Sequence, residues 1–354
     1  MESRSNHSRG DDGAPIAVPA PDLTAEPEGF VVEVGAGDRI HFLDWGLPDG
    51  TAAGAAPVTT PRARAESAPG ADAAPGPDAA PEPCGVLLIH GLSQTGLAWS
   101  PVARRLRHVV HAVAMDLRGH GLSDAPTSGY QPERLVEDAI AVAEGSGLLD
   151  LAEVGSDDSP RLVIAGHGFG AIVAAWTASF LADRCAGLVL VDGGWEDIRA
   201  SSGLEPDEFL RGLEEPPEVM RSMAAWLADR AAFDPESWDA DQERAARATI
   251  VEVPAGRVVS ATRPHALAAS VEAMFDYRPT LILSSVSAPI VVLTATDDEE
   301  GTRAAELAEV TGGLRAAGRP EPVVRGFPHA GHNLMRYRPA DVAAAILGLA
   351  LPVG

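Results

Sequence analysis

Short apolar runs alternate with amphipathic stretches over most of this chain. Apolar runs about the length of one strand occur at 85–89, 111–115, 161–165, 187–191 and 289–293, with a weaker one at 322–325. Uninterrupted runs of this kind are typical of strands covered on both faces. Helical periodicity occupies much of the intervening sequence, at 98–107, 132–144, 170–181 and 301–315, and again at 339–349. The alternation predicts an α/β fold with a mostly parallel central sheet flanked by helices.

Other patterns lie before and between these elements. Alternating apolar positions at 29–45, with the turn 35–38 between them, predict a β-hairpin. Residues 1–28 are polar and are expected to form a disordered tail. Residues 47–83 are almost wholly Gly, Ala, Pro, Thr and Asp, a composition that buries too little apolar surface to offset ordering. We therefore expect a flexible insertion within the first part of the core, 29–194.

The strand–helix rhythm stops at 195–287. This stretch is acidic and helical in pattern, and it contains several Met, Trp and Phe residues. A helical insertion over the carboxyl ends of the strands would be a cap that shapes a pocket. The alternative is a helical decoration with its own small core. The last part of the core is then 288–354.

Composition and charge narrow the possible partners. The 354 residues, 45% of them apolar, suffice for one large core, and the net charge of −24 disfavours nucleic acid and anionic membranes. The chain has no lysine, which excludes a lysine Schiff base. It shows neither a secretory signal nor a run of about 18 apolar residues. We expect a cytoplasmic protein whose partner is a small molecule; its oligomeric state is open.

Four segments carry the candidate chemistry, and their order is informative. They are His90-Gly-Leu-Ser93, the segment Asp116 to Asp124, Gly166-His-Gly-Phe-Gly170, and a late pair formed by Asp297-Asp298 and Gly331-His332. In this order the chain resembles the α/β-hydrolase superfamily, in its branch of capped esterases and C–C hydrolases. The resemblance covers about 29–349 without 47–83. It implies the α/β-hydrolase fold and a site assembled from an elbow, an acid and a histidine.

The elbow lacks its expected side chain. The resemblance implies a tight strand-to-helix turn at 166–170 with a nucleophilic serine at its centre, but Gly168 occupies that position. Glycine holds a positive-φ turn without strain, so the replacement removes the nucleophile and preserves the fold.

The rest of the site is implied by the same resemblance. His332 matches the terminal catalytic histidine, with His329 as a local competitor. Asp298 is the predicted acid, with Asp297 as the alternative. The backbone N–H groups of Leu92 and Phe169 are the predicted oxyanion hole.

Other polar residues near these motifs have structural interpretations. His90 is expected to anchor its loop by hydrogen bonds, His167 to be packed, and Asp116 and Asp124 to brace the following loop. Ser93 is the nearest hydroxyl in sequence that could replace the missing serine, although its attack geometry would differ. No organic cofactor is expected. The H-x-x-H spacings His108/His111 and His329/His332 lack the helical Glu of a zinc protease, so no metal is expected either.

Three functions fit this pattern. The first is a hydrolase-like enzyme on a small ester-type or related carbonyl substrate, in which His332 and an Asp activate water or abstract a proton. The second is a non-catalytic pseudo-hydrolase that binds a small ligand. The third is an ordinary serine hydrolase whose serine has been replaced to trap a substrate.

Overall fold

The computed structural model describes residues 23–46, 84–149, 161–295 and 301–351. Residues 1–22 of the predicted tail and the predicted insertion at 47–83 lie outside the described residues. The remainder of the predicted tail lies against the core. There the carbonyl of Ala25 accepts a hydrogen bond from Arg104 Nε, and Glu26 forms ion pairs with Arg104 and Arg244.

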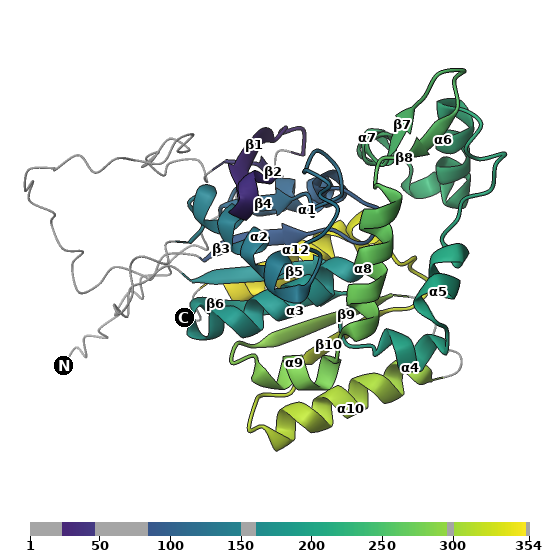
Figure 1. The fold of residues 1–354 in the computed structure, drawn as a ribbon. Helices are drawn as coiled ribbons and strands as arrows, with labels where there is room; N and C mark the ends of the chain where they lie inside the picture. The colour runs from purple at the N-terminus through teal and green to yellow at the C-terminus, as the bar shows by residue number, and fades with distance from the viewer. Residues whose placement is uncertain (1–22, 47–83, 150–160, 296–300, 352–354) are drawn as a thin grey trace, which may run out of the picture.

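The described residues form one eight-stranded sheet in the order β1-β2-β4-β3-β5-β6-β9-β10 (Figure 1). The first hairpin pairs antiparallel, β2 pairs antiparallel with β4, and the other neighbours are parallel. The fold prediction, the hairpin and all six apolar strands are therefore confirmed. The strands are β1 Glu28–Glu33, β2 Arg39–Asp44, β3 Gly85–Ile89, β4 Ala112–Met115, β5 Leu162–His167, β6 Cys185–Val191, β9 Ile290–Ala295 and β10 Val323–Phe327.

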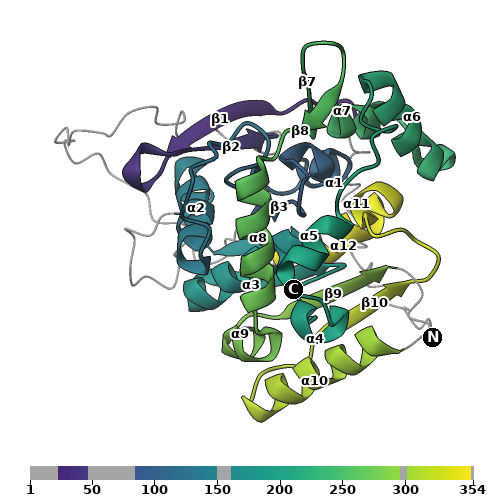
Figure 2. The ribbon, with the colours of Figure 1, turned by 45° about the vertical axis from the view of Figure 1, so that its right-hand side comes forward.

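Helices cover both faces of this sheet, as the buried strand pattern requires (Figures 1 and 2). On one face α1 Ser100–Leu106 and α12 Pro339–Ala350 pack on one apolar cluster. On the other face α2 Pro132–Gly145, α3 Phe169–Leu181 and α10 Thr302–Ala316 pack on a second cluster. These are the five predicted helices, and each end lies within two residues of its predicted position. Within the described residues, no helix is long and apolar enough to cross a membrane.

The segment 195–287 is mainly helical, as predicted, and divides into two parts. One part packs on the sheet's core through Met274, Phe275 and Leu283. The other has a small core of its own around Trp226, Ile250 and Val258. The helices are α4 Ile198–Ser202, α5 Pro206–Gly212, α6 Met223–Phe233, α7 Ala240–Ala248, α8 Pro264–Asp276 and α9 Pro279–Ser285.

The helical pattern did not predict a small hairpin within this segment. Strands β7 Ile250–Glu252 and β8 Val258–Ser260 pair antiparallel beside α6 and α7 (Figure 1). Three residues per strand are too few to show a two-residue period against a helical background. The residues of the hairpin's end and the following loop face the candidate site described next.

Candidate active site

The site lies at one edge of the sheet because the carboxyl ends of parallel strands meet there. The loop after β3 contributes Leu92, the turn after β5 contributes Gly168, β6 is followed directly by Asp192, and the loop after β10 carries His332. All four line one cavity.

Gly168 forms the tight turn between β5 and α3. Its φ is +52° and its ψ is −118°, a backbone conformation that L side chains rarely adopt. The flanking glycines allow close approach, since a Cβ on Gly166 would lie 2.1 Å from the carbonyl oxygen of Gly170. A Cβ on Gly168 would lie 3.4 Å from His332 Nε2, with no closer neighbour. The turn thus has the geometry of a nucleophile elbow, with open space beside His332 Nε2 in place of a side chain.

His332 is paired with Asp192. Its Nδ1 lies 2.6 Å from Asp192 Oδ2. The Asp192 side chain is only 2% exposed, whereas that of His332 is 58% exposed and reaches the cavity. The hydrogen bond on Nδ1 leaves Nε2 directed at the space over Gly168, the arrangement that a general base requires.

Asp192 was not among the residues predicted for this site. The predicted acid, Asp298, and its alternative, Asp297, lie outside the described residues. In the described residues the carboxylate on His332 instead follows β6, the neighbour of β9 in the sheet, whereas the prediction placed it after β9. The sequence contains a signal for this acid, because in Val191-Asp192-Gly193-Gly194 an aspartate directly follows an apolar strand. The order of motifs in the family instead led to the prediction of an acid in the later loop.

The Asp192 carboxylate is held by several donors. Its Oδ1 accepts hydrogen bonds from the backbone N–H of Ala295 at 2.7 Å and from Arg303 Nη2 at 2.8 Å. Burial by itself raises the pKa of Asp192, but the hydrogen bond with His332 and the charge of Arg303 outweigh it and hold that pKa below its usual value. The carboxylate therefore stays ionised and fixed towards His332.

Arg303 also binds a second buried carboxylate. Its Nε donates to Glu196 Oε1 at 2.8 Å, and its guanidinium lies 4.9 Å from the centroid of the Trp195 ring. Burial raises the pKa of Glu196, an effect that Arg303 only partly offsets. Two buried carboxylates, Asp192 and Glu196, thus share one arginine.

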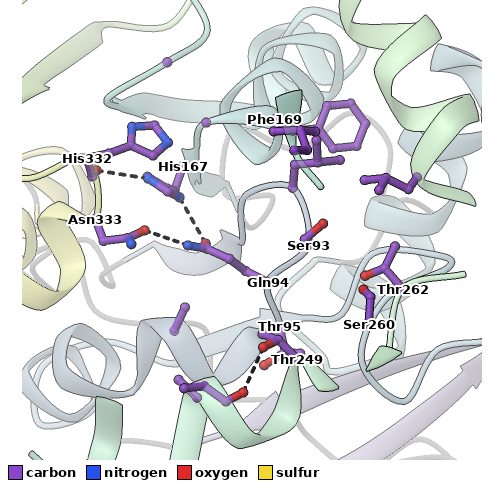
Figure 3. Close-up of a pocket in the computed structure, with 18 of the residues that line it drawn as sticks. Ser93, Gln94, Thr95, His167, Phe169, Thr249, Ser260, Thr262, His332 and Asn333 are labelled. Atoms are coloured by element: carbon purple, nitrogen blue, oxygen red, sulfur yellow. Dashed lines mark hydrogen bonds between the residues drawn. The ribbon is translucent and has the colours of Figure 1, made fainter. Parts of the chain in front are cut away.

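A second network joins the loops around His332. His167 is buried, with Nε2 3.1 Å from the carbonyl oxygen of His332 and Nδ1 3.1 Å from Gln94 Oε1. Gln94 Nε2 donates to Asn333 Oδ1 at 2.6 Å (Figure 3). Burial, followed by the nearby His332, places the pKa of His167 well below its usual value. His167 is thus packed as expected, and it ties the elbow to the histidine loop.

The loop before Gln94 is braced as the sequence suggested. His90 Nδ1 lies 2.7 Å from the carbonyl oxygen of Gly91, and His90 Nε2 accepts from Leu117 N–H at 3.0 Å. Asp116 accepts from the backbone N–H of Gly96 and lies 2.8 Å from His41 Nδ1. Asp124 is bonded to Arg39.

The predicted oxyanion residues flank the open space at the elbow. Leu92 and Phe169 both line the cavity, and Phe169 is the first residue of α3. Their backbone N–H groups come from the two loop positions from which this fold class stabilises an oxyanion. Ser93 lines the same cavity, but in Figure 3 its hydroxyl points away from His332.

The cavity has a volume of about 1080 Å³ and is bounded by both the core and the segment 195–287. The core side supplies the elbow, His332 and Ile172, and the inserted segment supplies Phe209, Met274 and several polar residues. The inserted segment therefore shapes the cavity in the way expected of a cap. His329 is exposed and is not part of the lining. No group of three or more His, Cys, Asp or Glu side chains in the described residues is arranged to hold a metal.

Comparisons with known proteins agree with this fold. A profile of the α/β hydrolase family matches residues 86–345, and the chain belongs to this family. An uncharacterised protein of Mycobacterium tuberculosis is 35% identical over 112 residues, 31% of this chain and 29% of that protein. The 2-(acetamidomethylene)succinate hydrolase of Mesorhizobium japonicum is 28% identical over 107 residues, 30% of this chain and 34% of the hydrolase.

Each of these matches spans about a third of the length of the curated relative. A crystal structure of an E-2-(acetamidomethylene)succinate hydrolase aligns with a TM-score of 0.60 at 17% identity, covering 91% of this chain and 98% of the hydrolase. That likeness shows the shared fold.

Proposed function

We propose that this protein is a hydrolase-type enzyme on a small ester-type or related carbonyl substrate, and that His332 and Asp192 activate water at the position of the missing serine. The observation that carries the proposal is the open space over Gly168, where a Cβ would lie 3.4 Å from His332 Nε2. A water in that space would lie within reach of a base already oriented by Asp192.

The reaction follows from this placement. The water oxygen attacks the carbonyl carbon while its proton passes to His332 Nε2. The N–H groups of Leu92 and Phe169 bind the developing oxyanion. As the carbonyl re-forms, the bond to the leaving group breaks, and the proton on Nε2 passes to the leaving oxygen. No acyl-enzyme forms, and Asp192, stabilised by Arg303, balances the charge on His332.

Such an enzyme would be slow on unactivated esters. A triad that has lost one member retains roughly 10³–10⁴-fold catalysis over water from its remaining groups. Binding energy from the cavity would favour one substrate, because it positions the carbonyl beside the water.

The second candidate is a ligand-binding protein without turnover. The observation in its favour is again Gly168, because the cavity of about 1080 Å³ is large enough for a small ligand while the elbow has no nucleophile to react with it. Some of the relatives, such as the hydrolase of Mesorhizobium japonicum, are named as hydrolases, which favours the first candidate.

The first experiment compares hydrolysis of short-chain p-nitrophenyl esters by the protein, Gly168→Ser, Gly168→Ala and His332→Ala. The unsubstituted protein should turn over slowly, and His332→Ala should be inactive. Gly168→Ser should hydrolyse the esters orders of magnitude faster than the unsubstituted protein and should form an acyl-enzyme detectable by mass spectrometry. Gly168→Ala adds a Cβ at the same positive φ without a hydroxyl, so it controls for strain.

Each outcome discriminates between mechanisms. Equal activity in His332→Ala and the unsubstituted protein would reject base catalysis by His332. If neither the unsubstituted protein nor Gly168→Ser hydrolyses any of the esters, the proposal of an enzyme is rejected in favour of the ligand-binding candidate.

A further inference from the structure

Five hydroxyl side chains line the cavity, and three of them gather on one side of it, away from His332. Ser93 belongs to the core loop after β3, Ser260 ends β8, and Thr262 lies between β8 and α8. In Figure 3 their hydroxyls lie on the side of the cavity opposite His332 and His167. These three residues are called the hydroxyl cluster below. Core and cap thus contribute jointly to one polar part of the lining.

The hydroxyl cluster has no partners of its own. Among the described residues, the side chains of Ser93, Ser260 and Thr262 make no hydrogen bond, although other hydroxyls of the chain do. Thr262 is only 3% exposed, and it lines the cavity, so a polar ligand there would supply the hydrogen bond that its hydroxyl does not make within the described residues.

Ser93 also carries backbone strain. Its φ is +58°, in the left-handed region that disfavours a serine. Backbone strain of this kind costs about 1–3 kcal/mol and occurs preferentially at ligand sites. Glycine would hold the same turn without strain, as Gly168 does nearby, so the folded chain alone gives no reason for a serine here.

The charges of the cavity determine which ligand fits. Each of its three arginines is already bonded within the protein. Arg303 binds Asp192 and Glu196, Arg230 lies 2.5 Å from Glu215, and Arg336 donates to Ser237 Oγ and the carbonyl of Asp234. Three glutamates and Asp192 also line the cavity, so its carboxylates outnumber its arginines, a balance that disfavours a carboxylate or phosphate ligand.

The remainder of the lining is largely apolar. Phe169, Ile172, Phe209 and Met274 lie in the part of the cavity formed by α3, α5 and α8. The elbow, this apolar part and the hydroxyl cluster line the same cavity, so a molecule whose carbonyl lies at the elbow can contact both parts.

We infer that the cavity selects an uncharged ester with an apolar acyl chain and a hydroxylated alcohol part, such as a monoacylated polyol, and that the hydroxyl cluster binds the alcohol part. Hydroxyls both donate and accept, so they match the hydroxyls of a polyol better than they match an ion. This inference rests on the proposed function for the position of the carbonyl.

Binding of ethers tests the inference without turnover. The probes are 1-O-hexylglycerol, hexyl methyl ether, the anion hexyloxyacetate and the cation 2-(hexyloxy)ethylamine. Trp226 and Trp238 line the cavity, so tryptophan fluorescence can report binding. We expect 1-O-hexylglycerol to bind at least about tenfold more tightly than the other three, because it forms two or more additional hydrogen bonds. Tighter binding of the anion or the cation, or equal binding of the methyl ether, overturns the inference.

Variants locate the binding. Thr262→Val and Ser260→Ala should each weaken 1-O-hexylglycerol binding by about three- to tenfold and leave hexyl methyl ether unchanged. Thr311→Val is the matched control, since Thr311 lies on α10 outside the cavity and bonds to the carbonyl of Leu307. Equal loss for both ethers in the cluster variants would mean a packing effect and would also overturn the inference.

Ser93→Gly gives a signature that a structural role would not give. Loss of the hydroxyl should weaken 1-O-hexylglycerol binding, while relief of the positive φ should raise Tm. A lower Tm with unchanged binding contradicts the assignment of Ser93. Because no ether can be hydrolysed, these results stand apart from the ester assays that test the proposed function.

Discussion

At the residue scale, the site differs from its expected form at two positions. Gly168 leaves open the space of a serine, and Asp192 takes the hydrogen bond on His332 that had been predicted for Asp298. Asp192 also has a φ of +45°, which few residues other than Gly, Asn and Asp tolerate. The buried donors around its carboxylate, Ala295 N–H and Arg303, hold it in this conformation. The environment of Asp192 is thus built around its charge.

The choice between the two acids can be measured. Asp192→Asn should lower ester hydrolysis about 10²-fold or more, because the amide cannot stabilise a protonated His332. Asp298→Asn is the matched comparison, and kcat/KM should stay within about twofold if Asp192 is the acid. The comparison uses kcat/KM in the Gly168→Ser background, where the rate is easiest to measure. A large loss in Asp298→Asn with little effect in Asp192→Asn would restore the acid predicted from the sequence.

At the element scale, the periodic patterns predicted the strands and helices of the main sheet correctly, but they did not predict the short hairpin β7–β8. Strands β3, β4, β5, β6 and β9 are continuous apolar runs because both faces of the sheet are covered, so their prediction needed no tertiary information. The hairpin β7–β8 has no such signal, and it lies where it does because Ile250 and Val258 pack on Trp226. This small core lies wholly within the cap, and other contacts join the cap to the core.

One such contact is the Arg104 cluster, which joins α1 to α7 and to residues 25–26. The Arg104 side chain is 6% exposed and pairs with Asp241 and Glu26. Arg104→Met should lower the unfolding free energy by about 1–3 kcal/mol, since it removes the hydrogen bonds that a nearly buried guanidinium makes with Ala25, Glu26 and Asp241. Amide hydrogen exchange should speed up in α7 more than in α3.

The control for that prediction is Arg338→Met, which breaks an exposed pair with Asp341. Its effect should stay below about 1 kcal/mol. Equal exchange rates in α7 for Arg104→Met and the unsubstituted protein would show that this cluster does not hold the cap.

At the scale of the whole molecule, several buried histidines make stability depend on pH. Burial, together with the nearby His90, lowers the pKa of His120 to about 3, and burial also lowers the pKa values of His90 and His167. Unfolded histidine has a pKa near 6.5. Between these values the unfolded chain binds protons that the folded protein does not bind. The stability that these neutral histidines contribute is therefore fully present above about pH 6.5 and is lost as the pH decreases towards the folded pKa values.

Urea unfolding between pH 7 and 4 measures this dependence. Each such histidine contributes a slope of up to about 1.4 kcal/mol per pH unit within its window. His120→Gln should flatten the slope by about one proton while keeping a polar group near the carbonyl of Arg118. An unchanged slope in His120→Gln would mean that His120 does not resist protonation in the folded protein.

The sequence by itself determined the sheet, its covering helices, the tight turn at Gly168 and the histidine at 332. These follow from local signals: apolar periodicity, glycines where strand and helix approach closely, and a motif order along the chain. Only the tertiary structure decided the partner of His332, the shared use of Arg303 by Asp192 and Glu196, and the hydroxyl cluster of Ser93, Ser260 and Thr262. Each of these joins residues distant in sequence, and pairing depends on distance, burial and competing hydrogen bonds in space, which no local pattern records.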